Sequence, residues 1–151
     1  LKVLDRHRQA LPSFNDDIQG TGAVGLAGLL AAGRITGRSI LDERIIIHGA
    51  GDDGLGITRQ IRSAMAEAGG TPDRVRSAIA VLDSRGLLVD DGSVRDDYKR
   101  ELAWPVQLAD SLGLGQGKRD LLNVVRAFRP TALIGTSGQP GSFSVRARLE
   151  K

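Results

Sequence analysis

The 151-residue sequence contains no cysteine and few aromatic residues, and both shortages narrow what the chain can be. Without cysteine it has no disulfides, no zinc ribbons and no thiol chemistry. Aromatic residues make up 3% and apolar residues 40% of the chain, so a core must consist mainly of alanine, valine, isoleucine and leucine. These residues suit the buried strands and packed helices of an α/β sheet.

Long apolar runs are also lacking. No stretch of 18 apolar residues occurs, and the first residues have no apolar core typical of a signal peptide. The sequence therefore predicts a cytoplasmic protein with no membrane contact. Because it starts with Leu1 rather than Met, we expect it to be a piece of a longer protein.

Positively and negatively charged residues are nearly equal in number. The chain has 21 lysine and arginine residues against 18 aspartate and glutamate residues, a net charge of +3. Basic and acidic residues alternate, as they do between Arg95 and Glu101. Nucleic-acid-binding proteins usually gather basic residues on one face, so we expect no nucleic-acid partner.

What the chain has in abundance is glycine, with 20 residues, about twice the usual share of roughly 7%. The length suits one domain. Apolar patterns predict strands at 44–48, 78–82 and 132–135 and helices at 1–11, 19–33, 53–68 and 118–128, with a helical turn near 95–103. Gly33 is expected to end the second helix, and Ser144 to cap a final one. The order of these elements predicts an α/β fold, a Rossmann-like open parallel sheet with helices on both faces.

A glycine-rich loop follows the first predicted strand. Gly49, Gly51 and Gly54 form the G-x-G-x-x-G pattern between a strand and a helix, which is typical of dinucleotide sites. The first glycine makes the turn, the second lets pyrophosphate approach the backbone, and the third permits close packing of helix and strand. Asp83, at the end of the next predicted strand, is placed to bind the adenosine ribose. The loop therefore predicts a bound dinucleotide.

The residues around Asp83 leave the type of dinucleotide open. A carboxylate favours the free ribose of NAD, because it repels the 2′-phosphate of NADP. Ser84 and Arg85 follow at once, and Lys99 and Arg100 lie further along, and all four are candidates for binding a phosphate. The alternative is that the three cations among them are surface residues without a ligand.

Two adjacent carboxylates, Asp16 and Asp17, precede the small-residue helix predicted at 19–33. Hard divalent cations such as Mg²⁺ and Mn²⁺ prefer oxygen ligands of this kind. Acidic residues at a helix start also act as caps that interact with the helix dipole, so both interpretations stay open on these residues alone. His48 is more readily explained as a packed residue than as a catalyst.

Four segments together resemble the malic enzymes, which are decarboxylating malate dehydrogenases. The segments are FNDDIQGT at 14–21, IIIHGAGDDGLGI at 45–57, VLDSRGLLV at 81–89 and RPTALIGTSGQPGSFS at 129–144. The resemblance implies that Asp17 is a ligand of Mg²⁺ or Mn²⁺ and that Asp16 lies beside the reacting malate. It also implies a set of residues for NAD or NADP: Thr21, Gly49, Gly51, Asp52, Asp53, Gly54, Asp83, Ser84 and Arg85, with Thr136, Ser137 and Gly138 on the nicotinamide side.

The resemblance implies oxidation and decarboxylation of malate to pyruvate and carbon dioxide, by an enzyme expected to be a homo-oligomer. Several groups of the family's active site have no counterpart here: a tyrosine and lysine for proton transfer, an arginine for the substrate carboxylate and a Glu-Asp metal pair. Residues 1–151 are therefore expected to be the NAD(P)-binding domain of a malic enzyme, inactive in isolation. The alternative is a non-catalytic dinucleotide-binding module or a regulatory truncation product.

Overall fold

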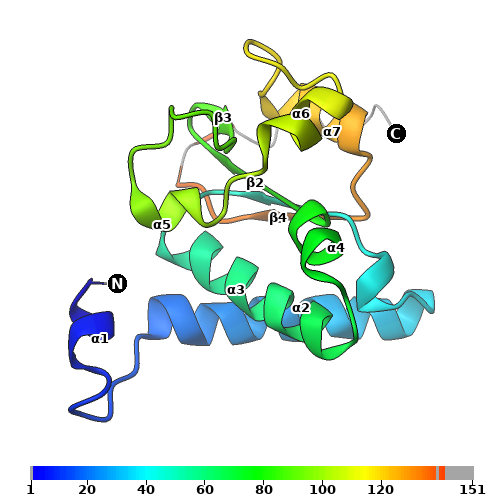
Figure 1. The fold of residues 1–151 in the computed structure, drawn as a ribbon. Coiled ribbons are helices and arrows are strands. Elements are labelled where there is room, and N and C mark those ends of the chain that lie inside the picture. Colours follow the sequence, from blue (N-terminus) through cyan, green and yellow to red (C-terminus); the bar gives the residue numbers. More distant parts are fainter. Residues whose placement is uncertain (1, 139, 142–151) are drawn as a thin grey trace.

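A computed structural model describes residues 2–138, 140 and 141 of the chain. Its centre is a four-stranded sheet with the order β3-β2-β1-β4 (Figure 1). The strands are β1 (Ile45–His48), β2 (Ile79–Asp83), β3 (Gly86–Leu87) and β4 (Ala132–Gly135). Strand β1 is parallel to both β2 and β4, as predicted, and β2 lies beside β1. The short strand β3 was missed, and it pairs with β2 in the antiparallel direction.

Helices cover both faces of this sheet, which confirms the Rossmann-like α/β fold. Helices α2 (Thr21–Thr36), α3 (Asp52–Glu67) and α4 (Pro72–Ser77) lie on one side, and α6 (Val106–Ser111) and α7 (Leu121–Phe128) on the other (Figure 1). The isoleucines of β1 alternate between two cores. Ile45 and Ile47 belong to the core on the α3 side, and Ile46 to the core that contains Trp104 and Phe128.

Close contact between α2 and α3 explains several glycines that would otherwise weaken a helix by about 1 kcal/mol each relative to alanine. A Cβ atom added at Gly22 would lie 2.7 Å from the carbonyl oxygen of Gly56. One added at Gly25 would lie 2.9 Å from the side chain of Ile57. The two helices can approach this closely only because glycine lacks a side chain, so close packing of this segment is confirmed.

Several predicted boundaries were wrong. The second predicted helix does not end at Gly33 but continues to Thr36, because Gly37 takes the left-handed conformation (φ 72°) and donates to the Gly33 carbonyl. The helix predicted from 118 begins at Leu121, since the side chain of Asp120 accepts the N–H of Asn123 and caps it. Helix α6 was not among the predicted helices. The cap predicted at Ser144 lies outside the described residues.

The remaining elements are short. They are α1 (Lys2–His7), which is shorter than the predicted helix at 1–11, a π-helical turn η1 (Asp16–Gly20), a 3-10 turn η2 (Ile40–Asp42) and α5 (Asp97–Arg100), the expected helical turn. Among the described residues, no helix is both long enough and apolar enough to cross a bilayer.

Candidate dinucleotide and metal site

The glycine loop joins the end of β1 to the start of α3, as predicted. Gly49 has φ 132°, a conformation that side chains rarely adopt, and an added Cβ would lie 2.4 Å from Thr136 Oγ1. The Gly49 N–H donates to the Leu82 carbonyl at 2.8 Å, and Thr136 Oγ1 donates to the Gly49 carbonyl at 3.1 Å. Gly49 thus makes a turn held between the ends of β2 and β4, which requires glycine for both its conformation and its neighbours.

The other two glycines of the pattern differ in what surrounds them. A Cβ at Gly54 would lie 1.8 Å from the Gly49 carbonyl oxygen, so packing of α3 against the loop requires glycine there. A Cβ at Gly51 would meet no atom of the chain within 4 Å. Gly51 is the N-cap residue of α3, whose first backbone N–H groups and helix dipole favour an anion. Internal packing therefore does not explain Gly51, whereas the approach of a phosphate would.

Asp83 ends β2 next to the glycine loop, as predicted, and its side chain is only 8% exposed. One carboxylate oxygen accepts the N–H of Arg85 at 2.8 Å, and the other lies 3.0 Å from Lys99 Nζ. Burial disfavours the charge of Lys99, but the hydrogen bond and charge of Asp83 outweigh that effect, and the pKa of Lys99 is raised. The structure thus presents a buried carboxylate and a cation side by side at the sheet edge.

The other candidate phosphate ligands are more exposed. Ser84 lies on the surface, and the guanidinium of Arg85 is 3.8 Å from Asp83 with a side chain that is 64% exposed. Arg100 pairs with Asp97 at 3.0 Å on the surface. Of the cations near Asp83, Lys99 is therefore the one that the fold holds in place.

Asp16 and Asp17 are exposed in the turn η1, and neither provides its cap. The cap is Asn15, whose side-chain oxygen accepts the N–H of Ile18 at 3.1 Å, while the Asn15 N–H donates to Gln19 at 3.0 Å. The side chain of Asp16 folds back over Gly20, where an added Cβ would lie 2.1 Å from Asp16 Oδ1. Sequence reasoning missed this role of Asn15, although asparagine is a favoured N-cap residue and stands directly before the two acids.

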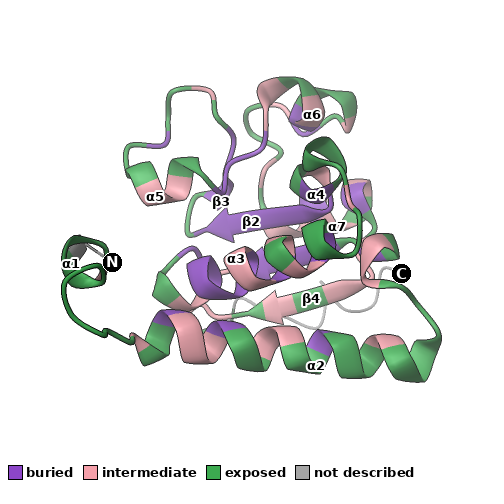
Figure 2. Cartoon of the chain, turned by 60° about the horizontal axis from the view of Figure 1, so that its bottom comes forward, coloured by how far each residue is buried: buried purple, intermediate pink, exposed green. Residues whose placement is uncertain are grey.

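The turn η1 packs against α3 near the glycine loop. Ile18 is 4% exposed, and a Cβ added at Gly56 would lie 2.0 Å from the Ile18 carbonyl oxygen. Helices α2 and α3 begin at the same side of the molecule, where β2 and β4 also end (Figures 1 and 2). The carboxylates of η1 and the glycine loop thus lie at one end of the fold, although more than thirty residues separate them in sequence.

The third predicted part of the site follows β4. Gly135 is opposite His48 in the register of the sheet, so Thr136 continues beside Gly49. Thr136 and Ser137 are partly buried, and Gly138 is exposed. The carboxyl ends of β2, β1 and β4 therefore bring Asp83, the glycine loop and Thr136 to one sheet edge, which is where open α/β sheets bind ligands.

Comparison with known proteins agrees with this arrangement. A family profile described as "Malic enzyme, NAD binding domain" matches residues 18–148. The chain belongs to the malic enzyme family. This assignment confirms the resemblance found in the sequence motifs.

Individual malic enzymes match nearly the whole chain. The NAD-dependent malic enzyme of Sodalis glossinidius is 42% identical over 142 residues, which cover 94% of this chain and 25% of that protein. The mitochondrial NAD-dependent malic enzyme of Saccharomyces cerevisiae is 39% identical, with 95% of this chain and 21% of that protein covered. A malolactic enzyme of Leuconostoc mesenteroides is 36% identical, with 94% and 26% covered.

A solved structure also matches. The crystal structure of the Entamoeba histolytica malic enzyme superposes with a TM-score of 0.65 at 27% identity, over 90% of this chain and 26% of that chain. The present chain thus spans about a quarter of the length of the malic enzymes that it matches.

The sequence motifs also predicted a metal ligand at Asp17. In residues 2–138, 140 and 141, no three histidine, cysteine, aspartate or glutamate side chains lie together as a metal site would need. Asp17 offers an exposed carboxylate with oxygen donors, which suits Mg²⁺ or Mn²⁺. Asp17 therefore fits the chemistry of one ligand of such an ion.

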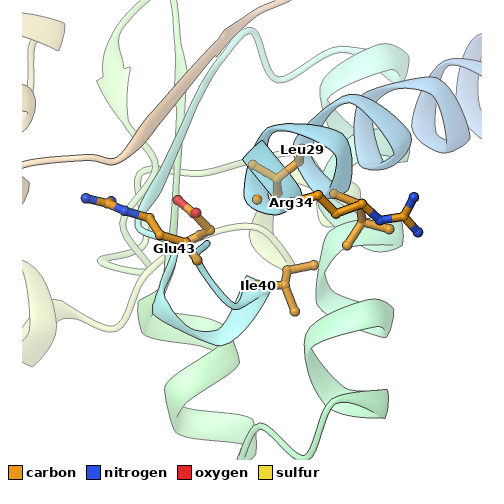
Figure 3. A pocket seen from close by; sticks show the side chains of 7 residues that line it. Leu29, Arg34, Ile40 and Glu43 are labelled. Carbon is orange, nitrogen blue, oxygen red and sulfur yellow. The ribbon is translucent and has the colours of Figure 1, made fainter. Parts of the chain in front are cut away.

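A separate pocket of about 220 Å³ lies beside the second half of α2, away from the glycine loop. It is lined by Leu29, Leu30, Gly33, Arg34, Arg38, Ile40 and Glu43. Figure 3 shows the Glu43 carboxylate beside this space and the Arg34 side chain pointing away from it. The Glu43 carboxylate accepts a hydrogen bond from Thr131 Oγ1, so it has a structural partner. This pocket was not predicted and contains none of the predicted site residues.

Proposed function

We propose that the chain is the dinucleotide-binding domain of an NAD-dependent malic enzyme, which oxidises malate and decarboxylates it to pyruvate and carbon dioxide. The convergence of the glycine loop, Asp83 and the Asp16–Asp17 pair at one end of the fold supports this function most directly. Neither a nucleotide loop alone nor an acidic turn alone would favour a metal-dependent dehydrogenase.

In this proposal the pyrophosphate lies against Gly49, Gly51 and Gly54, at the start of α3. Asp52 and Asp53 contribute backbone N–H groups of the first helical turn, because their carboxylates would repel an anion. Asp83 accepts hydrogen bonds from the ribose hydroxyls, with Ser84 and Arg85 beside it. Thr136, Ser137 and Gly138 line the nicotinamide side, and Thr21 joins the same site from the start of α2.

Asp17 is proposed as a ligand of Mg²⁺ or Mn²⁺, and Asp16 as a group beside malate. A metal ion held there by Asp17 would supply Lewis-acid chemistry for the decarboxylation. The chain's own contribution is to hold Asp17 beside the nicotinamide end of the site. It does so by fixing η1 on α3 through Ile18 and Gly56, and by capping the turn with Asn15.

NAD is the proposed coenzyme, since Asp83 suits a free ribose and the similar enzymes named above are NAD-dependent. NADP is the alternative coenzyme, because the cation Lys99 beside Asp83 offsets the repulsion between that carboxylate and a 2′-phosphate. Homo-oligomer formation and cytoplasmic localisation stay predictions. A mitochondrial relative in Saccharomyces cerevisiae means that location differs within the family.

The experiment that tests this function has two parts. Calorimetric titration of the chain with NAD should give binding that is largely lost in Gly51→Val, because a branched side chain fills the space for pyrophosphate. Gly115→Val is the matched control, since Gly115 is another glycine whose Cβ would meet no neighbour. Equal NAD binding by well-folded Gly51→Val and Gly115→Val proteins would contradict the nucleotide assignment.

The second part uses the complete malic enzyme that contains this domain. Malate, NAD and Mn²⁺ should give pyruvate, carbon dioxide and NADH in equal amounts. Lactate is measured in the same reaction, because a malolactic enzyme is among the relatives. Tight NAD binding without turnover of malate in the complete protein would favour the alternative of a non-catalytic dinucleotide-binding module.

A further inference from the structure

The turn that follows Asp83 is held by a segment far away in the sequence. An exposed turn at 84–85 joins β2 to β3, and Asp83 pairs with Gly86 across it. The N–H of Leu87 donates to the Arg119 carbonyl at 2.7 Å, and a Cβ added at Gly86 would lie 2.4 Å from the same oxygen. The β2–β3 turn therefore contacts the backbone of Arg119, in the segment between α6 and α7 (Figure 1).

The side chain of Arg119 holds that backbone in place. Its guanidinium donates to Asp91 at 2.6 Å and to the Leu114 carbonyl at 3.4 Å. The Arg119 and Asp91 side chains are only 15% and 12% exposed. The residues just before Arg119 form no helix or strand, and Gly113 and Gly117 among them take the left-handed conformation. The guanidinium thus links an irregular segment to the residues that follow β3.

Geometry is a better explanation than stability for a buried ion pair of this kind. Removing two charges from water costs most of what their attraction gains, so such a pair adds little to the stability of a fold. A planar guanidinium bonded at two of its nitrogens does fix the relative position of the segments that it joins. In this protein those segments hold the β2–β3 turn.

The orientation of the Asp83 carboxylate depends on that turn. One oxygen of the carboxylate accepts the Arg85 N–H at 2.8 Å, and the other lies 3.0 Å from Lys99 Nζ. Because Arg85 belongs to the turn, a shift of the turn moves one of the two donors that orient Asp83. Arg119 therefore acts on Asp83 through the backbone of the turn.

We propose that Arg119 is a positioning residue for the adenosine half of NAD. Its ion pair with Asp91 keeps the Arg119 carbonyl on the Leu87 N–H, and thereby fixes the turn that orients Asp83. The inference rests on the proposed function, in which Asp83 accepts hydrogen bonds from the adenosine ribose. Since the reacting groups lie at the nicotinamide end of the site, loss of the Arg119 side chain should weaken nucleotide binding and leave the chemical steps unchanged.

Kinetics of the complete malic enzyme with Arg119→Met test the proposal. The KM for NAD should rise roughly tenfold, as for coupled residues of one hydrogen-bond network, while kcat and the KM for malate change by less than about twofold. Calorimetric titration with ADP-ribose, which lacks the nicotinamide ring, should show the same loss of affinity as NAD. Arg119→Lys keeps a cation that can donate to Asp91, so it should recover most of that affinity.

Arg74→Met is the matched control, because Arg74 also pairs with a carboxylate, Asp42 at 3.2 Å, but lies in α4 just before the opposite end of β2. Equal ADP-ribose affinities of Arg119→Met and Arg74→Met would overturn the proposal. So would a loss in Arg119→Met that extends to kcat and the KM for malate. If Arg119→Met does not fold, Asp91→Asn opens the same ion pair and takes its place in each comparison.

Turnover of malate by the unaltered enzyme is measured beside these variants. Its absence would refute the proposed function, whereas the ADP-ribose affinities would still decide the role of Arg119.

Discussion

The position of Asp83 at the end of a strand predicted it as a site residue. Its ion pair with Lys99 could not be predicted from the sequence. Sixteen residues separate the two, and only the fold of α5 brings the lysine back to the carboxylate, at 3.0 Å. If Lys99 offsets the repulsion between Asp83 and a 2′-phosphate, Lys99→Met should weaken NADP binding more than NAD binding. Calorimetric titration with both nucleotides measures the ratio, and Arg100→Met, which removes a surface cation paired with Asp97, serves as control. Equal losses for the two nucleotides would contradict this role.

Asp91 gives a prediction about pH. Hydrogen bonds from Ser93 and from the Arg119 guanidinium, 2.6 Å away, hold the pKa of Asp91 well below its usual range. A carboxyl group with a lowered pKa stabilises the fold above the pKa of the unfolded chain, about 4, and loses this effect as pH falls further. Asp91→Asn should therefore cost about 1–3 kcal/mol of unfolding free energy at pH 7, and less below pH 4.

Denaturant unfolding of both proteins at pH 7 and pH 3 measures this difference. Asp97→Asn is the matched control, because Asp97 also pairs with an arginine but its side chain is 92% exposed. Its effect should stay below about 1 kcal/mol at either pH, as for other surface ion pairs. A difference for Asp91→Asn that is as large at pH 3 as at pH 7 would show that the ionised carboxylate is not the cause.

At the scale of elements, two helical glycines that look alike in sequence differ in their surroundings, because Gly56 of α3 packs against η1 and Gly28 of α2 has no neighbour. Gly56→Ala places a Cβ 2.0 Å from the Ile18 carbonyl oxygen and should destabilise the chain by about 1–3 kcal/mol. Gly28→Ala meets no neighbour and should stabilise the chain by up to about 1 kcal/mol. Thermal unfolding of the 151-residue protein compares the two directly. Equal shifts in melting temperature would contradict the packing described here.

The strands and helix ends show which elements sequence patterns could predict and which they could not. Strands β1, β2 and β4 were found because isoleucine, valine and leucine runs end at glycine or aspartate, and both faces of β1 are buried as such runs require. The end of α2 was misplaced because Gly33 and Gly37 both suit a helix end, and only the observed left-handed conformation distinguishes them. Strand β3 has two residues, too few for any periodic pattern, and depends on pairing with Leu82 and Asp83.

Within the candidate site, residues defined by backbone geometry were predictable and residues defined by distant partners were not. Gly49 and Gly54 follow from a motif whose spacing reflects a strand, a turn and a helix start. Asn15 as the cap of η1, Lys99 as the partner of Asp83 and the contact of Ile18 with Gly56 all depend on the three-dimensional fold. That Asp16 and Asp17 lie near the glycine loop follows from the last of these contacts.

At the scale of the whole molecule, the proposed metal site is divided between this domain and the rest of the enzyme. Asp17 is exposed and does not cap its turn, so Asp17→Asn should change the stability of the 151-residue chain by less than about 0.5 kcal/mol. NAD binding by that chain should be unchanged, and no pyruvate should form from malate with or without the substitution. In the complete enzyme the same change removes a charged metal ligand. Mn²⁺-dependent turnover should then fall by roughly 10²-fold or more, as when other positioned catalytic groups are lost.

The control for this last comparison is Asp73→Asn, which alters an exposed acid in the first turn of α4. It tests whether loss of any acidic residue near a helix start lowers activity through folding or net charge. Because α4 lies beyond α3, remote from the glycine loop in sequence and carrying no predicted ligand, turnover of this variant should match that of the unaltered enzyme. A complete Asp17→Asn enzyme with the same turnover and metal dependence as Asp73→Asn would remove Asp17 from the metal site, while the dinucleotide assignment, which depends on the glycine loop, would remain.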